Sequence, residues 1–582
     1  MLKTLAKSVR QYRPAVFLTL FFIVLEAVIE TLIPFITADL INSIKNGVVI
    51  SQLLSRGALL VVMAVISLCC GGIAGFTCAK ASSGFAKNLR HDIYQKVQTY
   101  SFGNIDKFSS ASLVTRMTTD VANVQMSFMM LIRTAIRSPL MLIFSVIMAY
   151  VMGGALSTAF VVVIPVLAFG LILIGKKALP AFRAVFKKYD RLNESIEENV
   201  RGMRVVKGFS REDYERKKFG AEAEKIRADF TKADRIISLN TPLMQFCMYF
   251  NMVFILLVGS KLAIESGGST IDVGQISAML NYGMQVLMSL MMLSMIYVML
   301  TMSAESAKRI LEVLNEEPSL KNPANPVMEV ADGSVDFCNV QFKYSEKAQR
   351  YALADVDLHI ASGMTVGVIG GTGTGKSSLV QLIPRLYDVT EGCVKVGGRD
   401  VREYDLEVLR GSVAMVLQKN LLFSGTIKEN LRWGNSTASD EELEEGCRLA
   451  QAHEFISSFP EGYDTKIEQG GTNVSGGQKQ RLCIARALLK KPKILILDDS
   501  TSAVDTKTDA LIRAGFREYI PNTTKIIIAQ RIASVQDADL IVVMENGRID
   551  AWGSHEELLA SSSIYREVYE QQTNGGAEDG EE

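Results

Sequence analysis

The stretch Ile494-Leu-Ile-Leu-Asp498-Asp499-Ser500 decides how the second half of this 582-residue chain is expected to fold. Four consecutive apolar residues favour a buried strand, and the strand ends in two acids. Beside a bound nucleotide, one carboxylate of such a pair can hold a magnesium ion and the other can act as a general base. The stretch therefore predicts an α/β nucleotide-binding domain, in which Asp498 binds Mg²⁺ and Asp499 is a catalytic residue.

A phosphate-binding loop lies upstream of this strand. Residues 370–377 fit the pattern G-x-x-x-x-G-K-[ST], between a predicted strand over 364–369 and a predicted helix over 378–386. The glycines allow backbone N–H groups to converge on phosphate oxygens at the helix N-terminus. Lys376 is expected to reach the β- and γ-phosphates of ATP, and the Ser377 hydroxyl is expected to hold Mg²⁺. The predicted nucleotide-binding residues here are Gly370, Gly371, Thr372, Gly373, Thr374, Gly375, Lys376, Ser377 and Ser378.

A third motif, Val474-Ser475-Gly476-Gly477-Gln478, comes just before a predicted helix that runs to Leu489. Small residues leave the N-terminus of such a helix open to a phosphate group. The motif resembles the signature of ATP-binding-cassette proteins, with Val474 in place of the usual Leu. The resemblance implies that Ser475, Gly476, Gly477 and Gln478 bind the nucleotide held by a second, similar domain.

Further positions match this family in the same order. The resemblance implies that Tyr344 stacks on adenine and that Gln418 touches Mg²⁺ or the attacking water. Asp505 ends Ser502-Ala503-Val504-Asp505, which matches the loop that crosses between two such domains. Gln469-Gly470-Gly471 lies where exporters of this family have a segment that contacts the membrane domain. The implied cofactors are ATP and Mg²⁺.

Two catalytic positions depart from the family pattern. Asp499 stands where the family has Glu, and Gln530 stands where the family has His. Replacing Glu by Asp withdraws the carboxylate by one methylene group, and a misplacement of about 1 Å can lower a rate on the order of 100-fold. Loss of His removes a group that contacts the γ-phosphate and stabilises developing charge. The expected result is a site that binds ATP but hydrolyses it poorly.

The first half of the chain is predicted to span a membrane. Hydrophobic residues make up 48% of the sequence, and six apolar stretches are long enough to cross a bilayer. No cleavable signal peptide is expected, because the first stretch is too long and contains acids. The predicted fold class is an all-α six-span membrane domain with long cytoplasmic helical extensions, followed by an α/β P-loop nucleotide-binding domain. The spans are expected near 15–36, 59–79, 137–154, 157–174, 242–264 and 275–301.

The charge of the loops predicts the orientation in the plasma membrane. Residues 176–235 carry 17 Lys and Arg and residues 80–116 carry 6, whereas residues 152–158 carry none. The basic loops and both termini are therefore expected in the cytoplasm. The family resemblance implies that the two long loops contact nucleotide-binding domains through turns near 104–113 and 200–211. Periodicity alone also allows solvated amphipathic helices there.

Composition sets the domain boundaries. The transmembrane domain is expected over 1–314, and three prolines break the chain in a linker over 315–327. The nucleotide-binding domain is expected over 328–573, and the acidic tail 574–582 is expected to be disordered. The eight cysteines show no metal-ligand spacing, and we expect them to be reduced.

Two features of the spans are candidates for substrate binding. Glu26 and Glu30 share one face of the first span, and an intramembrane carboxylate usually faces a polar interior. Glu26 either binds a cationic substrate or hydrogen-bonds a neighbouring span, while Glu30 is expected to be structural. The sixth span carries a stripe of flexible, polarizable methionines, which either lines a pathway or packs against lipid and helices. The predicted substrate residues are Glu26, Met284, Met288, Met291 and Met295.

These features predict one subunit of a heterodimeric, ATP-driven exporter of amphipathic compounds or drugs, similar to the degenerate-site subunit of bacterial heterodimeric multidrug exporters. By resemblance, two nucleotide domains meet head to tail. Ser475 would then complete the active site of a second half-transporter, which supplies the catalytic Glu and His. Asp499, Gln530, Gln418 and Ser475 are thus the predicted catalytic residues.

Two alternatives stay open. The chain could belong to a lipid or peptide exporter with the same machinery, or to a non-transporting membrane regulator that senses ATP. An importer is disfavoured, because its membrane and nucleotide parts are usually separate chains. Membrane lipid and an amphipathic small molecule are expected partners, and nucleic acid is not.

Overall fold

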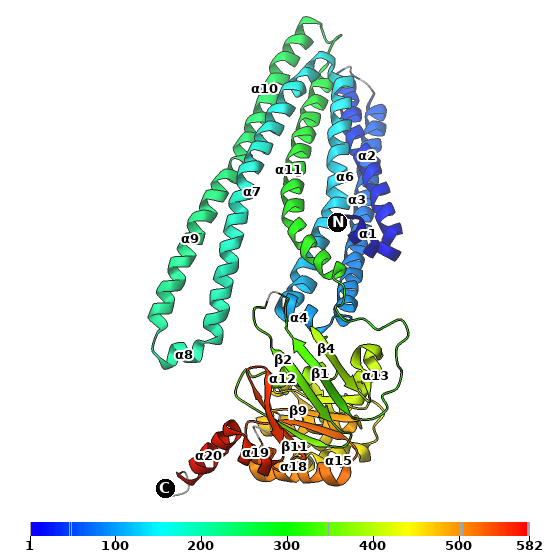
Figure 1. The fold of residues 1–582 in the computed structure, drawn as a ribbon. Coiled ribbons are helices and arrows are strands. Elements are labelled where there is room, and N and C mark those ends of the chain that lie inside the picture. The colour runs from blue at the N-terminus through cyan, green and yellow to red at the C-terminus, as the bar shows by residue number, and fades with distance from the viewer. Residues whose placement is uncertain (1, 46, 48, 347, 500–503, 579–582) are drawn as a thin grey trace. The chain divides into compact units, whose positions relative to one another are not determined.

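The computed structural model describes residues 2–578, except residues 46, 48, 347 and 500–503. The chain forms two compact units, which are best considered separately (Figure 1). The first consists of Met1–Thr99 and Ser109–Glu316, and the second consists of Tyr100–Phe108 and Glu317–Glu582. The change of unit near residue 316 lies inside the linker expected over 315–327.

One short segment lies in a different unit from the one that its sequence position suggests. Tyr100–Phe108, which contains helix α4 (Phe102–Phe108), falls within the expected membrane domain 1–314 but packs with the second unit. The reason is a set of polar contacts to the linker. The Asn104 side chain accepts a hydrogen bond from the Ser319 N–H at 3.1 Å and donates one to the Glu317 carbonyl at 3.0 Å.

The first unit is entirely helical in its described part. Each predicted span coincides, to within a residue at its ends, with part of one of the six long apolar helices found among the described residues. The elements are α1 (Leu2–Ala6), η1 (Lys7–Tyr12), α2 (Arg13–Lys45), α3 (Ile50–Gln98), α5 (Ser110–Thr115), η2 (Arg116–Asp120), α6 (Val121–Gly153), η3 (Gly154–Ser157), α7 (Thr158–Arg201), α8 (Met203–Gly208), α9 (Glu212–Ser238), α10 (Asn240–Glu265) and α11 (Val273–Asn315).

Helices α6 and α11 form the central pair of this unit, and α2 packs on both α3 and α6. Arg309 on α11 forms an ion pair with Asp120, whose side chain is fully buried. Arg116 contacts Glu312 of α11 at 3.2 Å. These ion pairs fix the end of α6 against α11, because a buried carboxylate is stable only with a partner.

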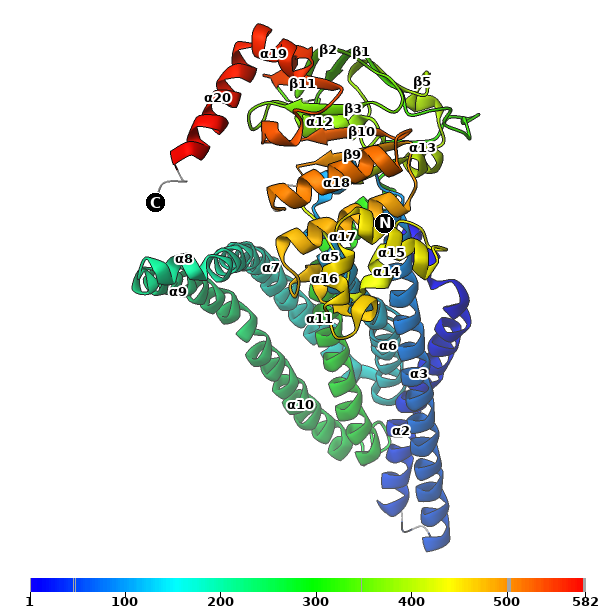
Figure 2. The same cartoon turned by 90° about the horizontal axis from the view of Figure 1, so that it is seen from below.

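Helix α7 continues well past its apolar segment, and the polar helix α9, which leads into the apolar helix α10, runs beside it; the short helix α8 joins the two (Figures 1 and 2). The turn expected near 200–211 therefore corresponds to α8. The tip exposes the apolar residues Val200, Val205 and Phe209 together with basic residues such as Arg204 and Lys207. Apolar side chains exposed together in this way are typical of a surface that contacts another protein domain.

The second unit is built on two main sheets. A six-stranded sheet has the order β12-β11-β3-β10-β9-β6, parallel except for β12. A four-stranded antiparallel sheet has the order β2-β1-β4-β5. The strands are β1 (Val335–Phe342), β2 (Leu353–Ile360), β3 (Thr365–Ile369), β4 (Glu391–Val396), β5 (Arg399–Asp400), β6 (Val413–Val416), β7 (Gly425–Thr426), β8 (Lys466–Ile467), β9 (Ile494–Asp498), β10 (Thr524–Ile528), β11 (Leu540–Glu545) and β12 (Arg548–Gly553).

The helices of this unit cover the six-stranded sheet, and α14 to α17 gather in one helical part (Figure 2). Two apolar cores hold it together, one under that helical part and one between the two sheets. The predicted fold class is thus confirmed. The remaining helices are α12 (Lys376–Leu382), α13 (Leu406–Ser412), α14 (Ile427–Leu431), α15 (Asp440–Leu449), α16 (His453–Ser457), α17 (Gly476–Leu489), α18 (Thr506–Tyr519), α19 (His555–Ser561) and α20 (Ser563–Glu578).

Two expectations concern the C-terminal tail and the cysteines. Helix α20 is assigned as far as Glu578, residues 579–582 lie outside the described part, and the disorder expected over 574–582 stays a prediction. All eight cysteines are free, as expected.

Candidate functional site

The phosphate loop joins β3 to α12 and requires glycine at several positions. Gly370 has φ +152°, and a Cβ there would lie 2.3 Å from the Met544 carbonyl oxygen. Gly375 has φ +96°, and a Cβ there would lie 2.6 Å from the Ala352 carbonyl oxygen. Larger residues would therefore push the loop away from its path. The glycines leave a cradle of backbone N–H groups at the start of a helix, which suits an anion.

Lys376 lies across this cradle. Its ammonium donates to the carbonyl oxygens of Gly370 at 2.7 Å and Gly371 at 2.6 Å. Burial lowers the pKa of Lys376, while the nearby charges of Asp498 and Asp499 act in the opposite direction. The ammonium is thus held at the loop where the β- and γ-phosphates are predicted to lie.

The predicted magnesium ligands Ser377 and Asp498 meet directly. The Ser377 hydroxyl donates to Asp498 Oδ1 at 3.0 Å, and Asp498 is only 4% exposed at the end of β9. Burial raises the pKa of Asp498, and the neighbouring Asp499 raises it further. A hydroxyl and a buried carboxylate beside a phosphate cradle fit Mg²⁺, which uses few protein ligands when phosphates supply the others.

Gln418 contacts the acid that follows Asp498. Its exposed side chain donates from Nε2 to Asp499 Oδ2 at 3.2 Å. The structure therefore places the predicted third metal ligand beside the predicted general base. This position agrees with the second role implied for Gln418, next to the attacking water.

Asp499 accepts hydrogen bonds from both flanking glutamines on a single oxygen. Gln530 Nε2 donates to Asp499 Oδ2 at 2.7 Å, in addition to Gln418. Asp499 also adopts φ +48°, a left-handed conformation that Asp tolerates better than most residues. Two amide donors thus hold Oδ2 of Asp499 between two glutamine side chains.

A residue not singled out in the sequence fixes this glutamine loop. Gln572 on α20 donates to the Gln530 carbonyl at 2.8 Å and accepts from the Ile532 N–H at 2.9 Å. A single amide side chain thus bridges both sides of Arg531. The sequence holds no local signal for this bridge, because Gln572 lies in a polar helix that is far from Gln530 along the chain.

Tyr344 lies beside the phosphate loop, as the resemblance implies. Its hydroxyl is 2.8 Å from the Ser378 hydroxyl, and its ring packs edge-on against Phe342 and Tyr387. Tyr387 in turn donates to Asp106 at 2.7 Å, within the segment that joins this unit from between α3 and α5. Tyr344 remains 50% exposed, so part of the residue stays accessible to a ligand.

The signature motif begins α17. Ser475 is the N-cap: its hydroxyl accepts from the Gln478 N–H, and the Gln478 side chain accepts from the Ser475 N–H at 2.9 Å. Gly476 and Gly477 form the open first turn. Val474 is buried in the apolar core, so its exchange for Leu concerns packing and leaves the phosphate-facing N–H groups unchanged.

Asp505 caps α18 and accepts from the Thr508 N–H at 2.9 Å. That backbone hydrogen bond lowers the pKa of Asp505, and the charge of Arg481 on α17 also contributes. Asp505 and the signature helix are therefore electrostatically linked. Ser502 and Ala503 of the crossing loop lie outside the described residues.

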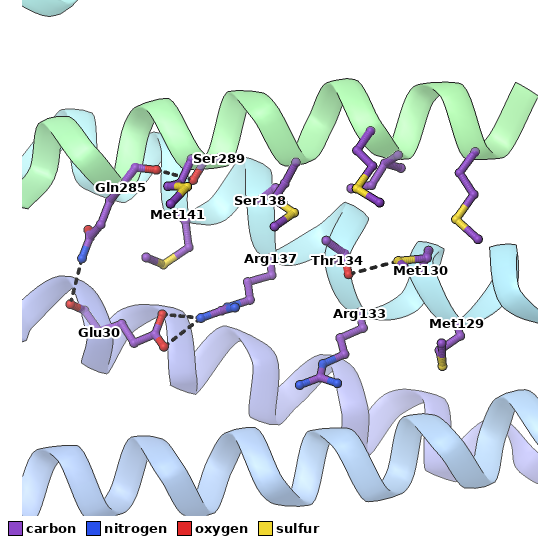
Figure 3. A pocket seen from close by; sticks show the side chains of 15 residues that line it. Glu30, Met129, Met130, Arg133, Thr134, Arg137, Ser138, Met141, Gln285 and Ser289 are labelled. Atoms are coloured by element: carbon purple, nitrogen blue, oxygen red, sulfur yellow. Dashed lines mark hydrogen bonds and ion pairs between the residues drawn. The ribbon is translucent and has the colours of Figure 1, made fainter. Parts of the chain in front are cut away.

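In the first unit, the structure gives both acids of α2 a structural partner. Arg137 on α6 lies 2.6 Å from Glu30 and 3.5 Å from Glu26 (Figure 3). Glu26 is 8% exposed and packs against Gly71 of α3. The geometry therefore favours the hydrogen-bonding interpretation of Glu26 over direct binding of a cation.

Part of the methionine stripe lines a cavity beside this ion pair. Met288 and Met295 line it, whereas Met284 and Met291 are not among its lining residues. A helix presents only one face to its neighbour, and here that face follows steps of three and four from Met288. The sequence did not indicate the matching methionines and arginines of α6. The methionines of the cavity are Met129, Met130, Met141, Met288, Met292, Met295 and Met299.

The fold and the site together define a membrane protein with a P-loop nucleotide-binding domain in the same chain. The family described as ABC transporter transmembrane region matches residues 16–302, and the family described as ABC transporter matches residues 353–502. YfiB of Bacillus subtilis strain 168, described as an uncharacterized ABC transporter ATP-binding protein, is 34% identical over 558 residues, or 95% of this chain and 96% of YfiB.

Other comparisons agree over the full length. An uncharacterized ABC transporter ATP-binding protein of Mycobacterium tuberculosis strain H37Rv is 33% identical over 572 residues, or 97% of each chain. The structure of a bacterial Atm1-family ABC exporter with ATP bound has the same fold, with a TM-score of 0.83 over 97% of this chain and 98% of that chain, at 22% identity. This chain belongs to the ABC transporter family, as a half-transporter with one membrane region and one nucleotide-binding domain.

Proposed function

We propose that this chain is one subunit of a heterodimeric, ATP-driven exporter of amphipathic compounds in the plasma membrane. Its own site binds ATP and Mg²⁺ but hydrolyses ATP poorly. Its signature motif completes the working site of a partner half-transporter that carries Glu and His at the positions of Asp499 and Gln530. The basic extensions and both termini lie in the cytoplasm, in keeping with the charge of the loops.

The observation that carries this proposal is the hydrogen bonding of Asp499. A general base needs a free lone pair directed at the attacking water. Here Oδ2 of the shortened Asp499 carboxylate accepts one hydrogen bond from Gln418, at 3.2 Å, and another from Gln530, at 2.7 Å. Gln530 is a neutral amide, so it cannot supply the positive charge that a protonated His would bring to the γ-phosphate.

The binding functions of the site are retained. Lys376 neutralises phosphate charge, the glycine cradle donates N–H groups, and Ser377 and Asp498 hold the metal. Mg²⁺ bound to ATP would supply charge neutralisation between the β- and γ-phosphates. The arrangement thus supports tight nucleotide binding with slow proton transfer, which is the behaviour of a regulatory site.

The signature motif supports a contribution in trans. Ser475 and the two glycines leave the N-terminus of α17 open, and the helix dipole there favours an anion. The capping box keeps the Gln478 side chain engaged with Ser475, so the remaining N–H groups of the first turn can point outwards. Nothing in this motif is altered in a way that weakens phosphate binding.

The test is the behaviour of the purified full-length chain in nanodiscs. We expect saturable binding of a fluorescent ATP analogue, and phosphate release no faster than that of a Lys376→Ala control. Robust turnover that Lys376→Ala abolishes would show that the site is catalytically competent. Binding and turnover both absent, with the fold intact by circular dichroism, would refute the proposed ATP-binding role.

A further inference from the structure

A cavity of about 560 Å³ lies between α6 and α11, with Glu30 of α2 at one side (Figure 3). This chain forms it without any partner. Seven of its fifteen lining residues are methionines, whose long, polarizable side chains accept apolar bodies of different shapes. The remaining lining includes two arginines, Arg133 and Arg137, one helical turn apart on α6.

The acids near the cavity are already engaged with Arg137. Glu30 receives the Arg137 guanidinium on both carboxylate oxygens, at 2.6 and 2.7 Å, and Glu26 lies 3.5 Å from the same nitrogen. The Glu30 backbone carbonyl accepts from Gln285, at 3.5 Å. Figure 3 shows the Arg137 side chain turned towards Glu30, away from Arg133.

Arg133 is different, because no carboxylate lies within 4.0 Å of its guanidinium and it makes no hydrogen bond in the described part of the chain. Its charge acts on Glu26 only from a distance. Arg133 is exposed, lines the cavity and lies beside Gly75 of α3, so its guanidinium donors stay available to a ligand. Unlike Arg137, Arg133 therefore retains its full capacity to bind an anion.

The depth of Arg133 suits a molecule with one charged end. From Gly153, at the end of α6, back to Arg133 the helix rises about 30 Å, which equals the thickness of the hydrocarbon core. A helix that enters the core at Gly153 would therefore reach the opposite boundary near Arg133. The cavity extends from there along the methionines of α11 towards Gln285.

The charge of Arg133 decides the preferred sign of the ligand. The lining residues carry two guanidinium groups and one carboxylate, a sum of +1, and Glu26, which lies 3.5 Å from Arg137, brings the sum of the wider cluster to zero. Glu26 lies outside the lining and is 8% exposed, which limits its contact with a bound molecule. Repulsion from Arg133 disfavours an organic cation, and it also disfavours a soft metal ion among the thioethers.

We propose that the cavity binds an amphipathic anion, with a carboxylate, sulfate or phosphate group at Arg133 and an apolar body against the methionines. This inference rests on the proposed export function, and it concerns an anion, in contrast to the cationic substrate that was one of the two alternatives for Glu26. A guanidinium pairs with such oxyanions through paired hydrogen bonds. The methionine wall would select for an apolar body without fixing its shape.

Direct binding tests this inference without ATP hydrolysis or a partner subunit, so the result is independent of the heterodimer proposal. The full-length chain in phosphatidylcholine nanodiscs is titrated with 11-(dansylamino)undecanoic acid and with its neutral methyl ester. Arg133→Gln removes the charge, and Arg133→Lys keeps it. Lys176→Gln is the matched control, since Lys176 is an exposed cation near the end of the apolar part of α7 and does not line the cavity.

We expect Arg133→Gln to raise the Kd of the acid at least about tenfold and to change the Kd of the ester less than twofold. Arg133→Lys should restore most of the affinity, and Lys176→Gln should change neither probe. Retained binding of the fluorescent ATP analogue shows that each variant is folded. Equal weakening of both probes, an unchanged Kd of the acid in Arg133→Gln, or no saturable binding of the acid to the unaltered chain would overturn the proposal.

Discussion

The hydrogen bonds on Asp499 lead to a direct test by restoration. Asp499→Glu extends the carboxylate by one methylene group, and Gln530→His removes the amide that lies 2.7 Å from Asp499 Oδ2. A correction of about 1 Å in the position of a reacting group can be worth on the order of 100-fold in rate. The returned His adds a contact to developing charge, of the kind whose loss typically costs about 2.7–4 kcal/mol.

The double substitution should therefore raise ATP turnover at least about 100-fold above that of the unaltered chain. The two changes act on one transition state, so the double variant should exceed the product of the single variants. One factor acts against the gain: Asp499 has φ +48°, and Glu in a left-handed conformation costs about 1 kcal/mol. The restored rate should therefore be lower than an unstrained site would give.

The assay is phosphate release by the purified chain, in a dimer whose mass is verified and whose sites are completed by its own signature motif. Lys376→Ala in the restored background controls for contaminating ATPases. If the restored dimer binds ATP but shows no increase over the unaltered chain, Asp499 and Gln530 are not what silences the site. If Gln530→His alone raises ATP turnover as much as the double variant does, the gain comes from removing the hydrogen bond to the Asp499 carboxylate and not from lengthening the side chain.

Three further outcomes follow from the same geometry. Burial raises the pKa of Asp498, so its ionisation opposes folding at neutral pH, and this cost disappears as the pH falls below that raised pKa. Asp498→Asn should therefore raise the Tm of the nucleotide-free protein and abolish the stabilisation by Mg²⁺ with ATP. An unchanged or lower Tm would contradict this sign. In a heterodimer, Ser475→Ala should slow single-turnover hydrolysis at the partner's site more than Asp499→Asn does, and equal losses would argue against a contribution in trans. Gln572→Ala should lower kcat in the restored background with little change in ATP binding, whereas the neighbouring Gln571→Ala should have no effect; equal behaviour of the two variants would mean that the bridge to Gln530 has no role.

The second half of the chain could be predicted in detail because its motifs are local. The strand that ends at Asp498 and the phosphate loop each lie within one continuous segment, and both adopt the expected conformation. The bridge from Gln572 could not be predicted, since its partners lie about forty residues away and a lone glutamine in a polar helix carries no pattern.

In the membrane half, too, local features could be predicted from the sequence and long-range contacts could not. Apolar length predicted the six helices, because crossing a bilayer imposes a minimum number of apolar residues. The partner of Glu26 and Glu30 depended on which helix packs against α2, and no periodicity within one span contains that information. Arg137 was read only as the start of a span, and Arg133 was not singled out for the same reason.

The ion pair of Arg137 with Glu26 and Glu30 has an evolutionary consequence. A lineage that loses the arginine first leaves two acids on one face of a span without their partner, which is costly. A lineage that loses the acids first leaves one arginine beside a cavity that already holds another. The order of replacement is therefore constrained. Among relatives of this chain, the positions of Glu26, Glu30 and Arg137 should change together, and any surviving intermediates should lack the acids and keep the arginine.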